Sequence, residues 1–326
     1  MSFENTGPNL SDVERGLLIE QYGGAVESQF AKDSIMRQYA DIRPVLGTDT
    51  VTNNRVGKTV VKKLVPGVRP PADPTPFGKV SLTVDTVVIA RDTRSMLNEF
   101  QVHFNARAEL GKDHGKQLGK FFDEAFIIMG IKGALTAAPD FGAGADRNSI
   151  GAGKFIDLAA PGDESDPDIL AQAITDILVQ MEEEEVPVEE MIVMVRPTDF
   201  NTLLNNNKLV DDDFSSDNAD YAGMRIQKIA NTRIVKTARI PREENDDHLL
   251  SNATNGYAYN VAGKEARAVA VIIHPKSFLA GETIPLTSDV YFDKIEKTWF
   301  IDSWMAFGVT VNRPDVNGAV FAAQPA

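Results

Sequence analysis

One apolar stripe, from about Phe100 to Leu135, constrains the fold more than any other feature of this sequence. Apolar and small residues recur there at spacings of four and three, which is the period of a helix face. They are Phe104, Ala108, Gly111, Gly115, Leu118, Phe122, Ala125 and Met129. At about 1.5 Å per residue, the predicted helix is on the order of 50 Å long.

Three glycines, Gly111, Gly115 and Gly119, lie inside this predicted helix. Each lowers helix stability by about 1 kcal/mol relative to alanine. The pattern leaves two interpretations open. The glycines could weaken or break the helix, or Gly111 and Gly115 on the apolar stripe could let another backbone approach closely.

A proline-rich stretch lies between two strand-like runs near the start of the chain. The runs are residues 58–65 (KTVVKKLV) and 79–90 (KVSLTVDTVVIA), and the second alternates as a strand does. Five of the chain's 17 prolines stand between them, at Pro66, Pro70, Pro71, Pro74 and Pro76. Prolines keep a loop extended and withhold backbone donors. We predict a projecting β-hairpin, which must pack on its own domain or lie across a neighbour, because two strands alone are marginally stable.

Charge is distributed unevenly along the chain, whose net charge is -14. Residues 55–94 hold eight basic and three acidic side chains, a balance of +5. Residues 163–220 hold 17 acidic side chains against Arg196 and Lys208, a balance of -15. The net charge argues against a stand-alone nucleic-acid binder, which needs clustered lysine and arginine.

The first 45 residues or so are predicted to form an arm. Residues 13–22 (VERGLLIEQY) are apolar on one helical face, and the glycines at 23 and 24 are expected to end that helix. Val26, Phe30 and Ile35 suit a second, short amphipathic piece that lies on another element.

The middle of the chain is predicted to be a compact α/β unit. Residues 165–185 begin with Ser165 or Asp166 as helix cap and Pro167 in the first turn. The expected buried face is Ile169, Leu170, Ala173, Ile174, Ile177, Leu178 and Met181. A buried strand (EEMIVMVRP), a short helix (TDFNTLLNN) and further strands (MRIQKIANTRIVKTARIP, EARAVAVIIHP) follow.

Residues 289–314 (DVYFDKIEKTWFIDSWMAFGVTVNRP) are interpreted as one long strand. Its more apolar face is Trp299, Ile301, Ser303, Met305, Phe307, Val309 and Val311. The tail after Pro314 is expected to be ordered only by contact with other elements.

No sequence pattern for catalysis or for a cofactor is convincing. The four histidines, His103, His114, His248 and His274, lack triad or metal-ligand spacing, and structural or surface roles are favoured. Residues 139–154 (PDFGAGADRNSIGAGK) fail the phosphate-loop pattern at two positions, which favours a flexible loop. Residues 211–220 lack the order of a calcium loop.

Four glutamates stand where a helix is predicted to end: Glu182, Glu183, Glu184 and Glu185. A nearby cation would relieve their unfavourable interaction with the helix dipole.

The absence of cysteine excludes a disulfide framework and thiol chemistry. No signal peptide and no run of about 18 apolar residues is found. We therefore expect no membrane association and a protein that is cytosolic when made.

The order of these parts resembles the major capsid protein of tailed bacteriophages, an α+β fold of the Hong Kong phage type. The resemblance is carried by residues 16–36 (GLLIEQYGGAVESQFAKDSIM), 43–47 (RPVLG), the hairpin, and 191–204 (MIVMVRPTDFNTLL), and is closest to the short-tailed podophage branch. It implies an N-terminal arm (1–49), an extended β-hairpin loop (50–91) and a peripheral domain with a spine helix (92–164). An axial domain (165–280) and a peripheral return strand with a tail (281–326) would follow.

The resemblance also implies function. The chain would assemble into pentamers and hexamers of an icosahedral shell that encloses double-stranded DNA without reading its sequence, and it would not be an enzyme. A separate scaffolding protein, a portal protein and a decoration protein are the expected partners, with assembly in the host cytoplasm and a final place in the virion. No cofactor or metal is expected.

We expect intersubunit contacts from the basic hairpin and from the acidic helix end. The residues are Lys62, Lys63, Arg69, Pro70, Pro71, Phe77 and Lys79, with Glu182, Glu183, Glu184 and Glu185 as their candidate partner. Two alternatives remain: an encapsulin-like nanocompartment shell, and an α/β enzyme with an acidic site near Asp211 to Asp220.

Overall fold

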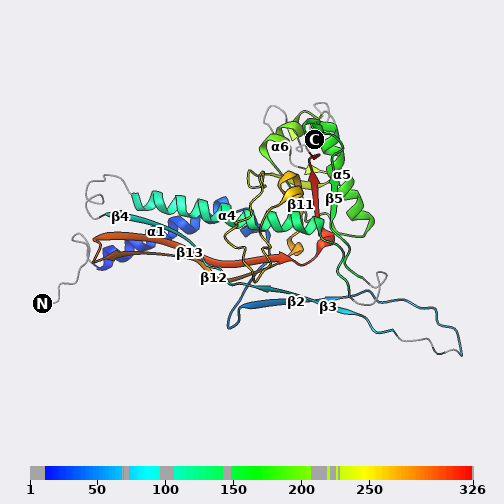
Figure 1. Ribbon diagram of the computed structural model, residues 1–326, viewed down its shortest axis with the longest axis horizontal. Coiled ribbons are helices and arrows are strands. Elements are labelled where there is room, and N and C mark those ends of the chain that lie inside the picture. Colours follow the sequence, from blue (N-terminus) through cyan, green and yellow to red (C-terminus); the bar gives the residue numbers. More distant parts are fainter. Residues whose placement is uncertain are drawn as a thin grey trace. The chain divides into compact units, whose positions relative to one another are not determined.

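The computed structural model describes residues 12–67, 69, 73–95, 106–141, 148–206, 219–220, 225–226 and 228–324 (Figure 1). The chain divides into two compact units. The first unit comprises Met1–Asp49, Val84–Asp123 and Gly281–Gly308. The second unit comprises Thr50–Thr83, Glu124–Ala280 and Val309–Ala326. The long helix α4 and the strands β12 and β13 contribute residues to both units.

The elements follow this order along the chain: α1 (Asp12–Asp33), α2 (Met36–Tyr39), β1 (Ile42–Pro44), β2 (Thr50–Val56), β3 (Phe77–Thr83), β4 (Val88–Ser95), α4 (Ala106–Leu135), β5 (Lys154–Asp157), α5 (Pro167–Glu183), β6 (Ile192–Val195), α6 (Pro197–Leu204), β7 (Ala219–Asp220), β8 (Arg225–Ile226), β9 (Lys228–Ile229), β10 (Thr232–Lys236), β11 (Ala268–Ile273), β12 (Phe278–Asp293), β13 (Thr298–Val311) and β14 (Asn317–Phe321). Short 3-10 helices span Asp163–Ser165, Gly263–Arg267, Pro275–Ser277 and Pro314–Val316.

In the first unit, α1 packs along the first part of α4, and two glycines of α4 make the contact possible. Tyr22, Val26 and Phe30 are buried and follow one face of α1. A Cβ atom on Gly111 would lie 3.0 Å from the ring of Tyr22, and one on Gly115 would meet the backbone oxygen of Val26. The glycines therefore serve the close approach of a second backbone, and α4 continues through them.

The prediction that Gly23 and Gly24 end the first helix was wrong, because α1 runs from Asp12 to Asp33. A Cβ atom on Gly23 would lie 3.0 Å from the hydroxyl of Ser288 in β12, so the absent side chain makes room for a strand. Packing of the buried stripe offsets the cost of about 1 kcal/mol per helical glycine.

The sheet of the first unit has the order β1-β12-β13-β4. Strand β13 runs antiparallel to β4, from Thr298 opposite Ser95 to Met305 opposite Val88. The single strand predicted for 289–314 is in fact two strands with a turn between them, and Lys297 in that turn has a φ of 54°. The predicted buried face of β13 is confirmed except at Val311, which is half-buried. Its buried residues are Trp299, Ile301, Ser303, Met305, Phe307 and Val309.

The second unit contains a mixed six-stranded sheet of the order β5-β14-β11-β6-β10-β9. Strand β11 is buried along its whole length. Ala270 and Ile272 share a hydrophobic cluster with α5, whereas a Cβ atom on Gly130 of α4 would lie 2.8 Å from Ile273. Helix α5 therefore covers one face of the sheet, and the last part of α4 packs on the other.

The local predictions for this sheet unit are confirmed. The carboxylate of Asp166 accepts hydrogen bonds from the backbone nitrogens of Asp168 and Ile169 at the start of α5. The predicted inner face of α5 is buried except at Ile169. Strand β6 and helix α6 occupy the predicted positions.

One further prediction was wrong, and one element was not foreseen. Residues 58–65 form no strand, and the partner of β3 is β2, at Thr50–Val56. The tail after Pro314 is ordered by contact with other elements, as expected, but in a form that the sequence did not predict: it contains the buried strand β14, which lies between β5 and β11 in the sheet. Both differences arise from long-range pairing, which local patterns do not report.

Candidate assembly surfaces

The β2–β3 hairpin is fixed at its base to other parts of the second unit. Asn53 Nδ2 donates a hydrogen bond to Asn312 Oδ1 at 2.9 Å. Arg55 Nη2 donates to the carbonyl oxygens of Val311, at 3.1 Å, and Asn312. Burial lowers the pKa of Arg55, and the nearby carboxylate of Asp315 opposes that shift. The hairpin therefore projects from a fixed base.

Residues 57–76, here called the hairpin loop, continue beyond the two strands (Figure 1). The backbone nitrogen of Gly57 donates to the oxygen of Pro76 at 2.7 Å, and Lys62 Nζ lies 2.5 Å from the Asp73 carboxylate. These cross-loop contacts, together with prolines that restrict the backbone, hold the two arms of the loop near each other. Pro70 and Pro71 lie outside the described residues.

Large apolar side chains of the hairpin are exposed to solvent. The exposed fractions are 95% for Val61, 71% for Phe77 and 69% for Leu64, and Val56, Val60 and Val65 are also exposed. Such a concentration of exposed apolar residues on one projection is typical of a surface that binds another macromolecule. The sequence pattern does not reveal this surface, because residues 58–65 fit a strand that would bury part of these side chains.

The hairpin also carries the predicted positive charge. Lys58, Lys63, Arg69 and Lys79 are exposed. Lys58, Lys63 and Arg69 form no ion pair with any described residue. Lys62 differs, because it already pairs with Asp73 within the loop. The loop therefore presents cationic groups beside apolar ones.

The acidic run lies at the end of α5, as the sequence predicted, and it is exposed. Its residues are Glu182, Glu183, Glu184 and Glu185. The expected relieving cation for Glu184 belongs to the same chain: Lys154 Nζ of β5 forms an ion pair with its carboxylate. Glu185 has a φ of 61°, the left-handed conformation in which helices often end. Glu182, Glu183 and Glu185 form no ion pair with another described residue, so they remain available for a cation from elsewhere.

The three described histidines have structural positions. His114 Nδ1 is 2.8 Å from the hydroxyl of Tyr22, which also lies 2.6 Å from Ser303 Oγ. Burial lowers the pKa values of His114, His248 and His274, and it raises the pKa of Tyr22 to about 12. His103 lies outside the described residues. Within the described ranges, no three His, Cys, Asp or Glu side chains are placed to hold a metal ion.

The glycine-rich segment gives no sign of a phosphate site where it is described. A Cβ atom on Gly153 would lie 2.5 Å from the backbone oxygen of Ala134, so this glycine serves packing. Lys154 is engaged with Glu184. Residues 142–147, and the acidic stretch at 211–220 except Ala219 and Asp220, lie outside the described residues.

Solved structures share this fold along most of the chain. The match to a chain of the bacteriophage PhiM1 mature capsid has 26% identity and a TM-score of 0.75, and it covers 90% of this chain and 88% of that one. The capsid structure of the cyanophage P-SCSP1u matches with 18% identity and a TM-score of 0.77, covering 90% and 89%. This chain is a phage-type major capsid protein.

The capsid protein is also similar in fold to the virus-like particle from Pyrococcus furiosus. That match has 11% identity and a TM-score of 0.54, and it covers 92% of this chain and 98% of the other. No protein-family model and no curated protein sequence matches the capsid protein. Among its described residues, no helix combines the length and the apolar character that a membrane span needs.

Proposed function

We propose that this capsid protein assembles with copies of itself into an icosahedral shell that encloses double-stranded DNA and becomes part of a virion. The observation that carries the proposal is the β2–β3 hairpin with its loop, which exposes Val61, Leu64 and Phe77 on a protein whose fold matches a capsid chain over 90% of its length. Burying each such side chain against a neighbour is worth about 1.5–3 kcal/mol.

The hairpin is the proposed intersubunit contact. Lys62, Lys63, Arg69, Pro70, Pro71, Phe77 and Lys79 would lie on a neighbouring subunit, with Glu182, Glu183, Glu184 and Glu185 as a candidate acidic partner. Apolar burial supplies the larger part of the contact free energy, because exposed ion pairs contribute about 0–1 kcal/mol each. Prolines keep the loop extended before it binds, which lowers the entropy cost of ordering it.

The finer features of the assembly are proposals supported by the resemblance to capsid proteins. They are an axial role for residues 165–280, pentamers and hexamers as building units, closeness to the podophage branch, assembly in the host cytoplasm, and a scaffolding, a portal and a decoration protein as partners. The similar solved structures are shells, which supports a structural role without catalysis.

Electron microscopy of the purified protein tests the proposal. We expect closed shells or capsomers in negative stain, with a scaffolding protein added if the chain needs one. A particle that stays monomeric under all assembly conditions contradicts the proposal.

A second function keeps the fold and changes the content of the shell. The similarity to the virus-like particle from Pyrococcus furiosus favours considering a nanocompartment that holds protein cargo. Shells that co-purify with a cargo enzyme and lack DNA would support it. Its lower TM-score, 0.54 against 0.77 for the cyanophage capsid, makes it the second choice.

A further inference from the structure

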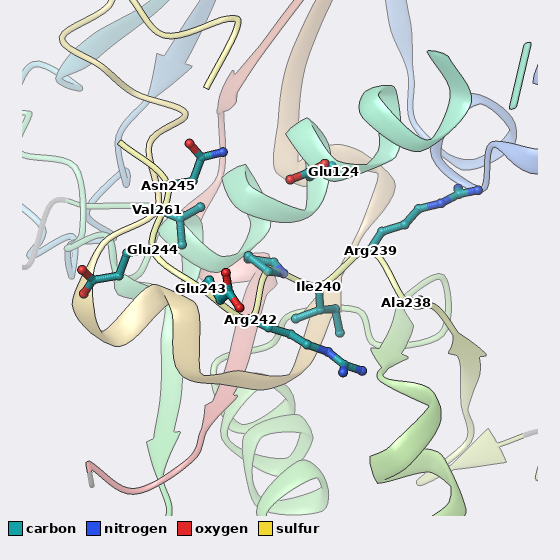
Figure 2. Close-up of a pocket in the computed structure, with 10 residues that line it drawn as sticks. Glu124, Ala238, Arg239, Ile240, Arg242, Glu243, Glu244, Asn245 and Val261 are labelled. Carbon is teal, nitrogen blue, oxygen red and sulfur yellow. The ribbon is translucent and has the colours of Figure 1, made fainter. Parts of the chain in front are cut away.

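A pocket of about 450 Å³ opens in the second unit (Figure 2). Glu124 of α4, residues 238–245 after β10, and Val261 line it. Apolar walls come from Ile240, Pro241 and Val261. The pocket therefore combines a carboxyl group with apolar surface, which suits the long aliphatic stem and charged end of a lysine or arginine side chain.

The carboxyl group of Glu124 has no counter-ion among the residues that the structure describes. It forms no hydrogen bond or ion pair with any described residue. Figure 2 shows the guanidinium groups of Arg239 and Arg242 turned away from it. Burial raises the pKa of Glu124, and no cation opposes that shift. An ionised carboxylate in this position is poorly solvated until a cation reaches it.

The lining residues carry a net negative charge. Glu124, Glu243 and Glu244 stand against Arg239 and Arg242, a balance of -1. The hairpin loop has the opposite balance: Lys58, Lys62, Lys63 and Arg69 against Asp73 give +3. Lys58, Lys63 and Arg69 are the exposed cations of that loop without an ion pair to any described residue, so each is free to enter a pocket on another molecule.

We propose that this pocket receives a lysine or arginine side chain from the hairpin loop of a neighbouring copy of the chain, with the Glu124 carboxylate as its counter-ion. The inference rests on the proposed function, because it requires the loop to reach a second subunit. It differs from the acidic run at 182–185, where Glu184 already has Lys154 as a partner.

Substitution Glu124→Gln removes the charge and keeps the shape. The matched control is Glu27→Gln, an exposed glutamate of α1. Shell formation is followed by light scattering and sedimentation as a function of subunit concentration. We expect Glu124→Gln to raise the concentration needed for assembly several-fold, with the control unchanged. The unfolding temperature of the unassembled Glu124→Gln subunit should equal or exceed that of the wild type, because the variant removes a poorly solvated charge.

The outcomes separate this inference from the proposed function. If the wild type forms shells and Glu124→Gln assembles at the same concentration, the pocket inference is overturned and the shell function stands. If the wild type never assembles, the proposed function fails and takes this inference with it.

Cross-linking gives a second, independent test, because the chain contains no cysteine. One batch of subunits carries Glu243→Cys at the pocket, and another carries a single cysteine in the loop at Lys58, Lys63 or Arg69. The batches are co-assembled and treated with a short bismaleimide. Covalent dimers from at least one loop position, absent when either batch assembles alone, support the proposal. Assembled shells that yield no dimer from any of the three positions overturn it.

Discussion

Strand β11 and the hairpin loop belong to the same unit, yet they differ in almost every physical respect. All six residues of β11 are buried, and the strand pairs with β14 on one side and β6 on the other. The loop exposes Val61 to 95% and Leu64 to 69%. The strand therefore has its partners within the chain, whereas the loop presents apolar groups that the subunit itself does not cover.

This contrast indicates where stability and assembly reside. Substitutions in β11 should act on the free energy of unfolding of the subunit. Substitutions in the loop should act on association between subunits. The predictions below run from the largest expected change in the free energy of unfolding to the smallest.

Val271→Asp should unfold the subunit or lower its free energy of unfolding by about 4 kcal/mol or more, because it places an unpaired charge in a buried strand. Urea unfolding followed by circular dichroism measures the change. Val61→Asp is the matched control and should stay within about 0.5 kcal/mol of the wild type. An equal loss of unfolding free energy in the two variants would contradict the distinction between the buried strand and the exposed loop.

Acid should lower the free energy of unfolding of the subunit, because it protonates the buried side chain of His248. This ring stacks on Tyr259 at 5.5 Å between ring centroids, and burial lowers its pKa to about 4. An unfolded histidine has a pKa of about 6.5, so the unfolded chain binds more protons between these values. The stabilising effect is complete above pH 6.5 or so and is lost as pH falls toward 4, by up to about 3 kcal/mol.

Unfolding of the wild type and of His248→Asn at pH 7 and pH 4.5 measures this effect. Asparagine keeps an acceptor for the backbone nitrogen of Leu250, which now donates to His248 Nδ1 at 3.2 Å. The variant should show a smaller loss of stability on acidification. An identical loss in both proteins would show that His248 does not contribute.

Removal of the Lys154–Glu184 ion pair should have a small effect. Glu184 is exposed, so the pair should contribute about 1 kcal/mol or less. A double-mutant cycle with Lys154→Ala and Glu184→Ala isolates the coupling free energy. A coupling free energy well above 2 kcal/mol would indicate that the Lys154–Glu184 pair is shielded from solvent, as buried ion pairs are, and is not part of the solvated surface.

Sequence patterns predicted those elements whose determinants are local. Helix α5 follows from Asp166 as cap, Pro167 in the first turn and a regular apolar face. Strand β2 was missed because its polar residues Asn53 and Arg55 give no alternation. The hydrogen bonds of both residues are long-range. Asn53 bonds to Asn312 at a sequence separation of 259. Arg55 bonds to Val311 and Asn312 at separations of 256 and 257.

The candidate surfaces could be predicted only in part, because the exposure of a side chain depends on contacts with residues that are distant in the sequence. The positive charge of the loop can be read from Lys62, Lys63 and Arg69. The exposure of Val61 and Leu64 cannot be predicted from the sequence, because the residue pattern around them also fits a half-buried strand. Glu124 was missed altogether, since the residues that face it, 238–245, are more than 100 positions away and no motif links them.

The smallest effect on unfolding should come from the loop, and it should bring the largest effect on assembly. The double substitution Val61→Asp and Leu64→Asp replaces two exposed apolar groups, so the unfolding temperature of the subunit should not change. Association should be lost, because each charge would have to be buried against a neighbour. Ile295→Asp, at a residue exposed to 91% in the β12–β13 turn, is the control for a general effect of added charge.

Electron microscopy of the wild type beside the Val61→Asp, Leu64→Asp variant, under identical assembly conditions, tests the central claim most directly. We expect closed shells from the wild type and folded, unassembled subunits from the variant. Normal shells from the variant, or a wild type that never assembles, would contradict it.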